Sequence, residues 1–237
     1  MTYGRAFFDL QLRFAETVSK LAGLPLAQTL LAYTNLYIRL GLGRDFDPAH
    51  PGWREYLAGL PSADDRGEWT YRCYVTRPPG RDAPTVVATF GCFAYAWLGE
   101  DRIRLHFLNA EPDARSPLGV ERQGQRRAEL VALFEHVKRN GLQPSVVGAS
   151  WLYNLKAYRC LFPPAYLATA RVIRGRFQHM PLWGQFLDRR GELREPSTRQ
   201  LLERLGRQKR LDTLDECFPL QVLRVEASVR EFCDFYV

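Results

Sequence analysis

Residues 116–130, SPLGVERQGQRRAEL, combine the residue types that bind phosphate groups. The relevant side chains are those of Gly119, Arg122, Gly124, Arg126 and Arg127. Glycine lets a ligand approach the backbone closely, and arginine offers charge-assisted hydrogen bonds to an anion. A helix follows, and the free N–H groups and positive dipole end at a helix N-terminus attract anions. The stretch therefore predicts either a phosphate cradle or a basic helix start with exposed arginines.

Composition indicates a globular chain. Its 237 residues are 46% hydrophobic and 25% charged, enough apolar residues for one substantial core or two small ones. No run of about 18 apolar residues and no secretory signal is present, so we expect a cytoplasmic protein without a membrane span. The five cysteines have no CxxC spacing, and with the four histidines they form no zinc pattern, so we expect reduced thiols and no metal.

Periodicity predicts the helices and strands that position the basic stretch. Apolar residues at three- and four-residue spacing predict helices over 5–22, 25–41, 53–60, 126–141, 151–162 and 198–208. Alternation and β-branched runs predict strands over 68–77, 85–98, 103–110, 144–150, 165–177 and 220–228. The first three strands predict an antiparallel meander. The expected fold class is α/β (α+β), with a mixed, mainly antiparallel central sheet flanked by helices.

This order of elements resembles the GNAT superfamily of acyl-CoA N-acyltransferases over about residues 5–178, without the family's initial strand. In that fold a three-strand meander leads into the helix that binds coenzyme A, and a strand, a helix and a strand follow. The family's signature places Gln or Arg three residues before a glycine and Gly or Ala two residues after it. Aligned on Gly124, this chain has Glu121 and Arg126 at those places.

The resemblance implies an acyl-CoA co-substrate, or an acyl carrier protein, bound through the residues of 116–130 and through Asn154. Asn154 and Ala157 match the start of the family's next helix, but Leu161 occupies the place of its tyrosine. Tyr158 or Tyr153 could protonate the leaving thiolate instead, or the tyrosines could be core aromatics. His106 is the candidate general base, since its ordinary pKa suits that role, although a surface histidine fits equally well.

Positive charge is concentrated late in the chain. Residues 171–210 hold eleven of the basic and four of the acidic side chains, which accounts for the formal net charge of +7. Arginines there alternate with Phe177, Trp183 and Phe186, a pattern that also occurs in proteins that stack nucleic-acid bases. A solvated arginine-rich surface explains the same charge.

Three hypotheses follow. The first is an acyltransferase, with a single acyltransferase-like domain over 1–180 and a basic C-terminal extension over 181–237 packed on it. The second is a non-enzymatic protein that binds nucleic acid or another anionic partner through 171–210. The third is a relative of the same fold that has lost coenzyme A binding. The first predicts that the strands over 103–110 and 144–150 splay apart.

Overall fold

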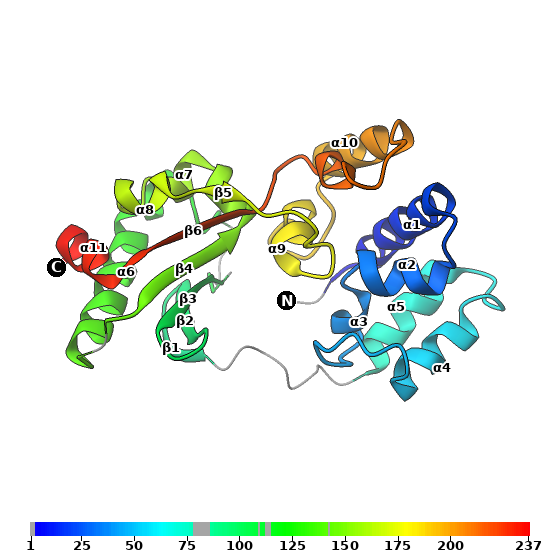
Figure 1. Ribbon diagram of the computed structural model, residues 1–237, viewed down its shortest axis with the longest axis horizontal. Coiled ribbons are helices and arrows are strands. Elements are labelled where there is room, and N and C mark those ends of the chain that lie inside the picture. Colours follow the sequence, from blue (N-terminus) through cyan, green and yellow to red (C-terminus); the bar gives the residue numbers. More distant parts are fainter. Residues whose placement is uncertain (1–2, 78–85, 109, 112–114, 142) are drawn as a thin grey trace. The chain divides into compact units, whose positions relative to one another are not determined.

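The computed structural model describes residues 3–77, 86–108, 110–111, 115–141 and 143–237, which form two compact units (Figure 1). Unit 1 comprises Met1–Ala83 and Arg174–Gln221, and unit 2 comprises Pro84–Ile173 and Val222–Val237. The domain predicted over residues 1–180 therefore includes parts of both units. Its predicted boundary with the 181–237 extension falls inside unit 1.

The regular elements in the described residues of unit 1 are helices, apart from an isolated antiparallel bridge between Leu187 and Leu193. Its helices are α1 (Arg5–Ala22), α2 (Leu26–Tyr33), α3 (Leu36–Arg39), α4 (Pro51–Gly59), α5 (Arg66–Thr76), α9 (Met180–Trp183) and α10 (Glu195–Gly206), with 3-10 turns η3 (Gly184–Phe186) and η4 (Leu214–Cys217). The amphipathic helix predicted over 5–22 is confirmed, and Phe8 and Leu12 on its buried face pack with Trp53 and Tyr56. Aromatic packing thus holds the N-terminal helices together.

The strand predicted over 68–77 is wrong, because these residues form α5. Asp65 caps this helix by accepting a hydrogen bond from the backbone N–H of Glu68 at 2.9 Å. The buried residues Gly67, Thr70 and Cys73 recur every three positions, which is helical spacing. The alternation of Trp69, Tyr71, Cys73 and Val75 with other residues hid that period.

The single helix predicted over 25–41 is interrupted after α2. The side-chain Oε1 of Gln11 accepts the backbone N–H of Asn35 at 2.9 Å, and the Thr34 hydroxyl accepts the N–H of Leu36. The two accepting residues, Gln11 and Thr34, are fully buried. Since these amides are bound by side chains, they do not continue the helical ladder, and α3 begins as a separate turn.

Unit 2 is built on a six-stranded sheet in the order β1-β2-β3-β4-β6-β5. The strands are β1 (Val86–Phe90), β2 (Phe93–Trp97), β3 (Arg102–Phe107), β4 (Ser145–Ser150), β5 (Arg171–Val172) and β6 (Leu223–Ser228). All neighbours pair antiparallel except β3 and β4, which are parallel. The predicted class, a mixed and mainly antiparallel sheet flanked by helices, is confirmed.

The meander consists of different strands from those predicted. Residues 86–97 form a hairpin, β1 and β2, where one strand over 85–98 was expected. Gly91 turns the chain with a φ of +57°, a conformation that glycine adopts without strain. The predicted strand over 103–110 is β3, which ends at Phe107. Residues 85 and 109, at the margins of these predictions, lie outside the described residues.

Helices cover one face of the sheet. They are α6 (Gln123–Arg139), preceded by the 3-10 turn η1 (Val120–Arg122), then η2 (Trp151–Asn154), α7 (Lys156–Arg159), α8 (Pro164–Ala168) and α11 (Val229–Tyr236). Leu130, Leu133 and Phe134 of α6 pack against Phe93 and Tyr95 of β2. The rings of Phe134 and Phe232 stack at 4.4 Å, which fixes α11 on α6.

Two further predictions in unit 2 are corrected. The strand predicted over 165–177 begins within α8 (Pro164–Ala168), and only the short edge strand β5 forms in the rest of it. The helix predicted over 151–162 is divided into η2 and α7. The helix predicted over 126–141 and the strand predicted over 144–150 are present as α6 and β4.

Candidate active site

The parallel ladder between β3 and β4 ends before either strand does. The ladder joins Arg102 to Ser145, Ile103 to Val146 and Arg104 to Val147, and no registered pair follows. β3 continues to Phe107, whereas β4 continues to Ser150 in register with β6. The backbone groups on the facing edges of these two strands are therefore not joined to each other beyond Arg104 and Val147. The splay predicted for residues 103–110 and 144–150 requires such unjoined edges, and it stays a prediction.

The start of α6 lies at the splayed end of β3. Arg126, in the first turn of α6, contacts the Sγ atom of Cys92 in the β1–β2 turn. Cys92 directly precedes Phe93, which pairs with Phe107 at the end of β3. The positive dipole end of α6 therefore faces the same end of the sheet as the separated strands.

Arg126 is held within the protein. Its side chain is 1% exposed and pairs with Glu111 at 2.5 Å and with Glu129 at 2.8 Å. Arg122 also pairs with Glu111, and Glu129 accepts the backbone N–H of Cys92 at 3.0 Å. This cluster joins the β1–β2 turn to α6. Two of the predicted phosphate ligands thus have carboxylate partners, and those of Arg126 are buried.

The other residues of the basic stretch have different surroundings. A Cβ atom at Gly124 would meet no atom within 4 Å, so the first turn of α6 is open at this position. Gly119 lies beside the carboxylate of Glu121 and accepts the backbone N–H of Arg122 at 3.0 Å. The Arg127 guanidinium lies over the Phe235 ring at 4.8 Å, and so is drawn toward α11. Gly124 is the member of the set with free space around it.

Three tyrosines surround Gly148 of β4, one residue beyond the last β3–β4 pair. The hydroxyl groups of Tyr153 and Tyr166 are 2.8 Å apart, and both would overlap a Cβ atom at Gly148. The Tyr158 ring lies 5.1 Å from that of Tyr153 and 5.4 Å from that of Phe107 on β3. Tyr158 therefore joins α7 to Phe107 on β3 and to Tyr153, the tyrosine that lies at Gly148.

Burial raises the pKa of Tyr153, Tyr158 and Tyr166 well above the ordinary tyrosine value, chiefly by desolvation. All three phenols therefore keep their protons at neutral pH. A protonated phenol can donate a hydrogen bond to a developing thiolate, although full proton transfer to the sulfur from so weak an acid is uphill.

His106 lies on the opposite face of the sheet from Tyr158. Its cross-strand partner is Ala94, whereas Phe107, the next residue, faces Phe93 and Tyr158 in the core. The two predicted catalytic side chains thus flank the separated strands from opposite faces. Asn154 ends η2, where its side chain donates to the Trp151 carbonyl at 2.7 Å.

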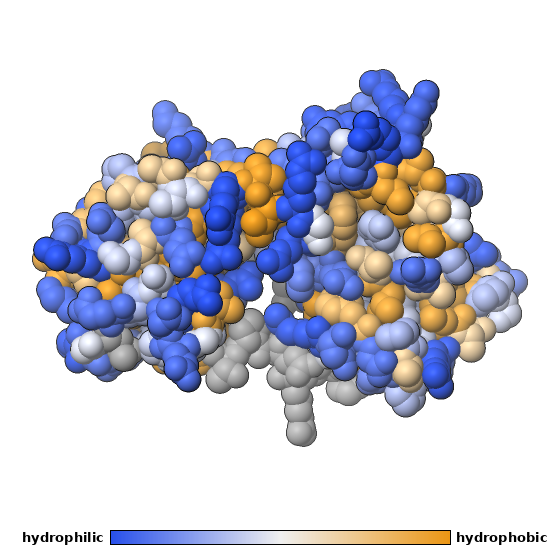
Figure 2. All heavy atoms as spheres, in the orientation of Figure 1, coloured by the Kyte–Doolittle hydropathy of each residue, from blue (hydrophilic) through white to orange (hydrophobic). Residues whose placement is uncertain are grey.

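The basic segment belongs mostly to unit 1. Hydrophilic side chains gather over α10 in Figure 2, and Arg199 and Arg207 are exposed there. The aromatic residues proposed for base stacking are not available, because Phe177, Trp183 and Phe186 are at most 7% exposed. They pack around Phe218, which lies within 6 Å of each ring centroid.

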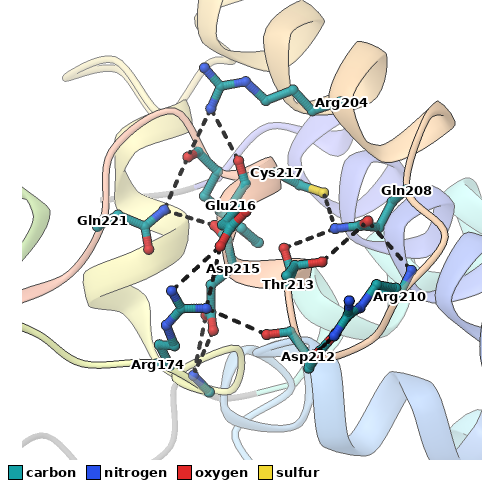
Figure 3. Close-up of polar contacts among 12 residues, drawn as sticks. Arg174, Arg204, Gln208, Arg210, Asp212, Thr213, Asp215, Glu216, Cys217 and Gln221 are labelled. Carbon is teal, nitrogen blue, oxygen red and sulfur yellow. Dashed lines mark hydrogen bonds and ion pairs between the residues drawn. The ribbon is translucent and has the colours of Figure 1, made fainter.

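A polar network fixes the loop after α10 (Figure 3). Asp215 is buried and accepts the backbone N–H of Gly175 at 3.2 Å. Arg204 donates to the carbonyls of Glu216 and Phe218 at 3.2 and 3.3 Å, and Arg174 pairs with Glu216 at 3.4 Å. Several cations of the segment thus have a structural role at this loop.

Sequence patterns did not indicate Glu111, Gly148 or Tyr166. Glu111 lies in a loop, and only the adjacent arginines hint at its pairing. The short strand around Gly148 could have marked a close backbone approach, because glycine within a strand often has that role.

No known protein family, curated protein or solved structure matches the chain. Among the described residues, no group of three or more histidine, cysteine or acidic side chains is placed to hold a metal ion. No helix in the described part of the chain has the length and apolar character needed to cross a membrane.

Proposed function

We propose that unit 2 transfers an acyl group from a thioester, acyl-CoA or an acyl carrier protein, to an amine. The observation that carries this proposal is the end of the β3–β4 ladder at Arg104 and Val147, at the end of the sheet where α6 begins. Backbone N–H and C=O groups on the separated edges can hydrogen-bond an extended amide-containing arm, as sheet edges do for added strands. The GNAT resemblance implies the same placement of the donor.

The donor's phosphate groups would lie at the first turn of α6. The open position at Gly124 and the N-terminal dipole favour an anion there. Arg122 and Arg127 are the nearby cations of this binding site, whereas Arg126 contributes by fixing the helix start. Because Glu111 competes for Arg122, we expect the phosphate contacts to come mainly from backbone N–H groups.

The reacting carbonyl would lie between the separated strands. On one face, the His106 imidazole accepts the proton lost by the attacking amine. On the other, the Tyr158 hydroxyl hydrogen-bonds the departing sulfur. The amine forms its bond to the carbonyl carbon on one side and the sulfur departs from the tetrahedral carbon on another, so groups on opposite faces suit the two tasks.

A thermal-shift titration tests this proposal with coenzyme A, acetyl-CoA and a long-chain acyl-CoA. Ligand at about 100 times its dissociation constant should add about 2.7 kcal/mol to the free energy of unfolding, a shift of a few degrees. The expected result is a shift with at least one of the three that persists at moderate salt. Absence of any shift contradicts coenzyme A as donor carrier, and the assay is then repeated with an acyl-carrier thioester.

A second candidate function is supported by exposed cations of the late segment. Several exposed basic side chains make no ion pair with any described acidic residue, among them Arg176, Arg190, Arg194, Arg199, Arg207 and Lys209. Such charge favours a polyanion such as nucleic acid. Binding of a short RNA or single-stranded DNA should then weaken steeply with salt, and Arg199→Gln with Arg207→Gln should flatten that dependence. An unchanged salt slope contradicts this function.

A further inference from the structure

The two faces of the unit 2 sheet differ in chemistry. The ladder register places apolar residues such as Phe93, Leu105 and Val225 on the face covered by the helices. The opposite face carries Arg102, Arg104, His106, Arg171, Arg224 and Glu226, together with small residues of β2 and β4. Glu226 is the acidic residue of the described strands on that face, and it pairs with Arg224 at 2.7 Å.

Arg171 and Arg224 are direct partners on neighbouring strands. They occupy one register position of the antiparallel β5–β6 ladder, so their side chains leave the same face side by side. Like charges placed directly opposite each other destabilise a sheet. Arg171 is exposed and makes no ion pair with a described residue. An anion bound between the two guanidinium groups removes the repulsion, because arginine binds a carboxylate with two parallel hydrogen bonds.

This pair lies on the same face of the sheet as the candidate general base. His106 lies two residues beyond Arg104 on β3, so it projects from the same face as Arg104. His106, Arg224 and Arg171 therefore lie on β3, β6 and β5, with β4 between β3 and β6. Since paired strands lie about 4.8 Å apart, β3 and β6 are about two such spacings apart where β3, β4 and β6 pair. The side chains and a short flexible molecule together can span that distance.

We propose that the acceptor is an amine that also carries a carboxylate, with the carboxylate bound by Arg171 and Arg224 and the amino group beside His106. The inference rests on the proposed acyl transfer, because only that reaction gives the amino group its role as acceptor. The anion site itself does not require an acyl donor. A carboxylate is favoured over a phosphate, because Glu226 on the same face repels a dianion more strongly than a monoanion.

Saturation-transfer NMR on the full chain tests the site without any acyl donor. The probes are 4-aminobutanoate, 6-aminohexanoate and 2-aminoethyl phosphate. Each of the two carboxylates is compared with its primary amide, which keeps the amino group but lacks the carboxylate charge. We expect the carboxylates to bind and the amides not to bind. Arg171→Gln should raise the dissociation constant about tenfold, the effect of losing a hydrogen bond to a charged group. Arg230→Gln is the matched control, since Arg230 is an equally exposed arginine on α11.

Equal binding of the amides, tighter binding of the phosphate, or an Arg171→Gln variant that binds like the wild type would overturn the inference. Failure of the proposed acyl transfer can be distinguished from failure of the anion site. Carboxylate binding without any thermal shift from a thioester leaves the anion site standing and removes the transfer. A thioester shift without carboxylate binding does the reverse.

Discussion

Arg104 of β3 and Val147 of β4 form the last registered pair of the parallel ladder, and the next residue of β4, Gly148, lies directly under two tyrosine hydroxyl groups. The separation of the strands and the buried phenols thus occur at the same place. Because the phenols fill the space above Gly148, that position does not accept a side chain without movement of Tyr153 or Tyr166.

The first prediction concerns this contact. Gly148→Ala should lower the free energy of unfolding by about 1–3 kcal/mol, because the added methyl group displaces buried hydroxyls in a packed core. Urea denaturation measures the change. Gly124→Ala is the control, since its methyl group meets no atom within 4 Å, and it should be neutral or stabilise α6 by at most about 1 kcal/mol.

Should Gly148→Ala fail to fold, the pair Gly148→Ala with Tyr153→Phe decides the matter. Removing the Tyr153 hydroxyl relieves the closest of the overlaps with the methyl group, so the double variant should be more stable than the sum of the single changes implies. Strict additivity of the two effects would show that the overlap is not the cause.

The second prediction concerns the buried charges at the start of α6. Glu111→Gln removes the carboxylate shared by Arg122 and Arg126 and leaves buried guanidinium charge behind. Unfolding should become easier by about 3–5 kcal/mol. Asp234→Asn, which breaks the exposed pair of Asp234 with Arg230, should cost below about 1 kcal/mol. Similar costs for the two variants would argue against a buried cluster.

The third prediction concerns alkaline pH. An unfolded tyrosine ionises near pH 10, whereas burial keeps the pKa of Tyr153, Tyr158 and Tyr166 above that value in the folded chain. The unfolded state therefore loses these protons first, and stability that is complete below about pH 10 declines as the pH rises further. Urea midpoints between pH 9 and 11 measure this decline. Tyr166→Phe should make it shallower, and an unchanged slope speaks against the buried phenol.

The fourth prediction concerns the Tyr158 hydroxyl. Tyr158→Phe should slow acyl transfer by at least about tenfold, because the departing sulfur loses its hydrogen-bond donor. Tyr236→Phe is the control, since the Tyr236 hydroxyl donates to the Leu161 carbonyl in the same core but does not reach the separated strands. Steady-state rates with a thioester donor distinguish the two. Equal losses would assign both hydroxyls a structural role.

Local patterns predicted the long elements of this fold well. The regular apolar spacing of residues 5–22 and of the α6 segment reflects one buried face, so the sequence was sufficient there. Segment 68–77 was wrongly predicted as a strand, because apolar residues alternate along it from Trp69 to Val75. Its buried residues instead follow helical spacing, in a helix that Asp65 caps. The Asp65 cap starts a helix here, whereas the hydropathy pattern alone fits a strand as well as a helix.

The candidate site was only partly predictable. Residue type alone indicated that Arg126 could bind a phosphate, but its partner Glu111 lies in a loop that no periodicity describes. The positions of His106 and Tyr158 on opposite faces of the sheet depend on the pairing of β3 with β2 and on the contact of Tyr158 with Phe107, which joins residues distant in sequence. The same holds for Arg171 and Arg224, which are distant in sequence and adjacent in the sheet.

The most direct test of the account is a calorimetric titration of the full chain and of Gly124→Trp with an acyl-CoA, at moderate salt. The indole would occupy the open space beside the first turn of α6 without disturbing a packed core. The account predicts saturable binding to the wild type and at least about tenfold weaker binding to Gly124→Trp, with an unchanged unfolding midpoint for the free variant. Equal binding by both chains would place the ligand elsewhere and contradict the assignment of the α6 N-terminus as the donor site.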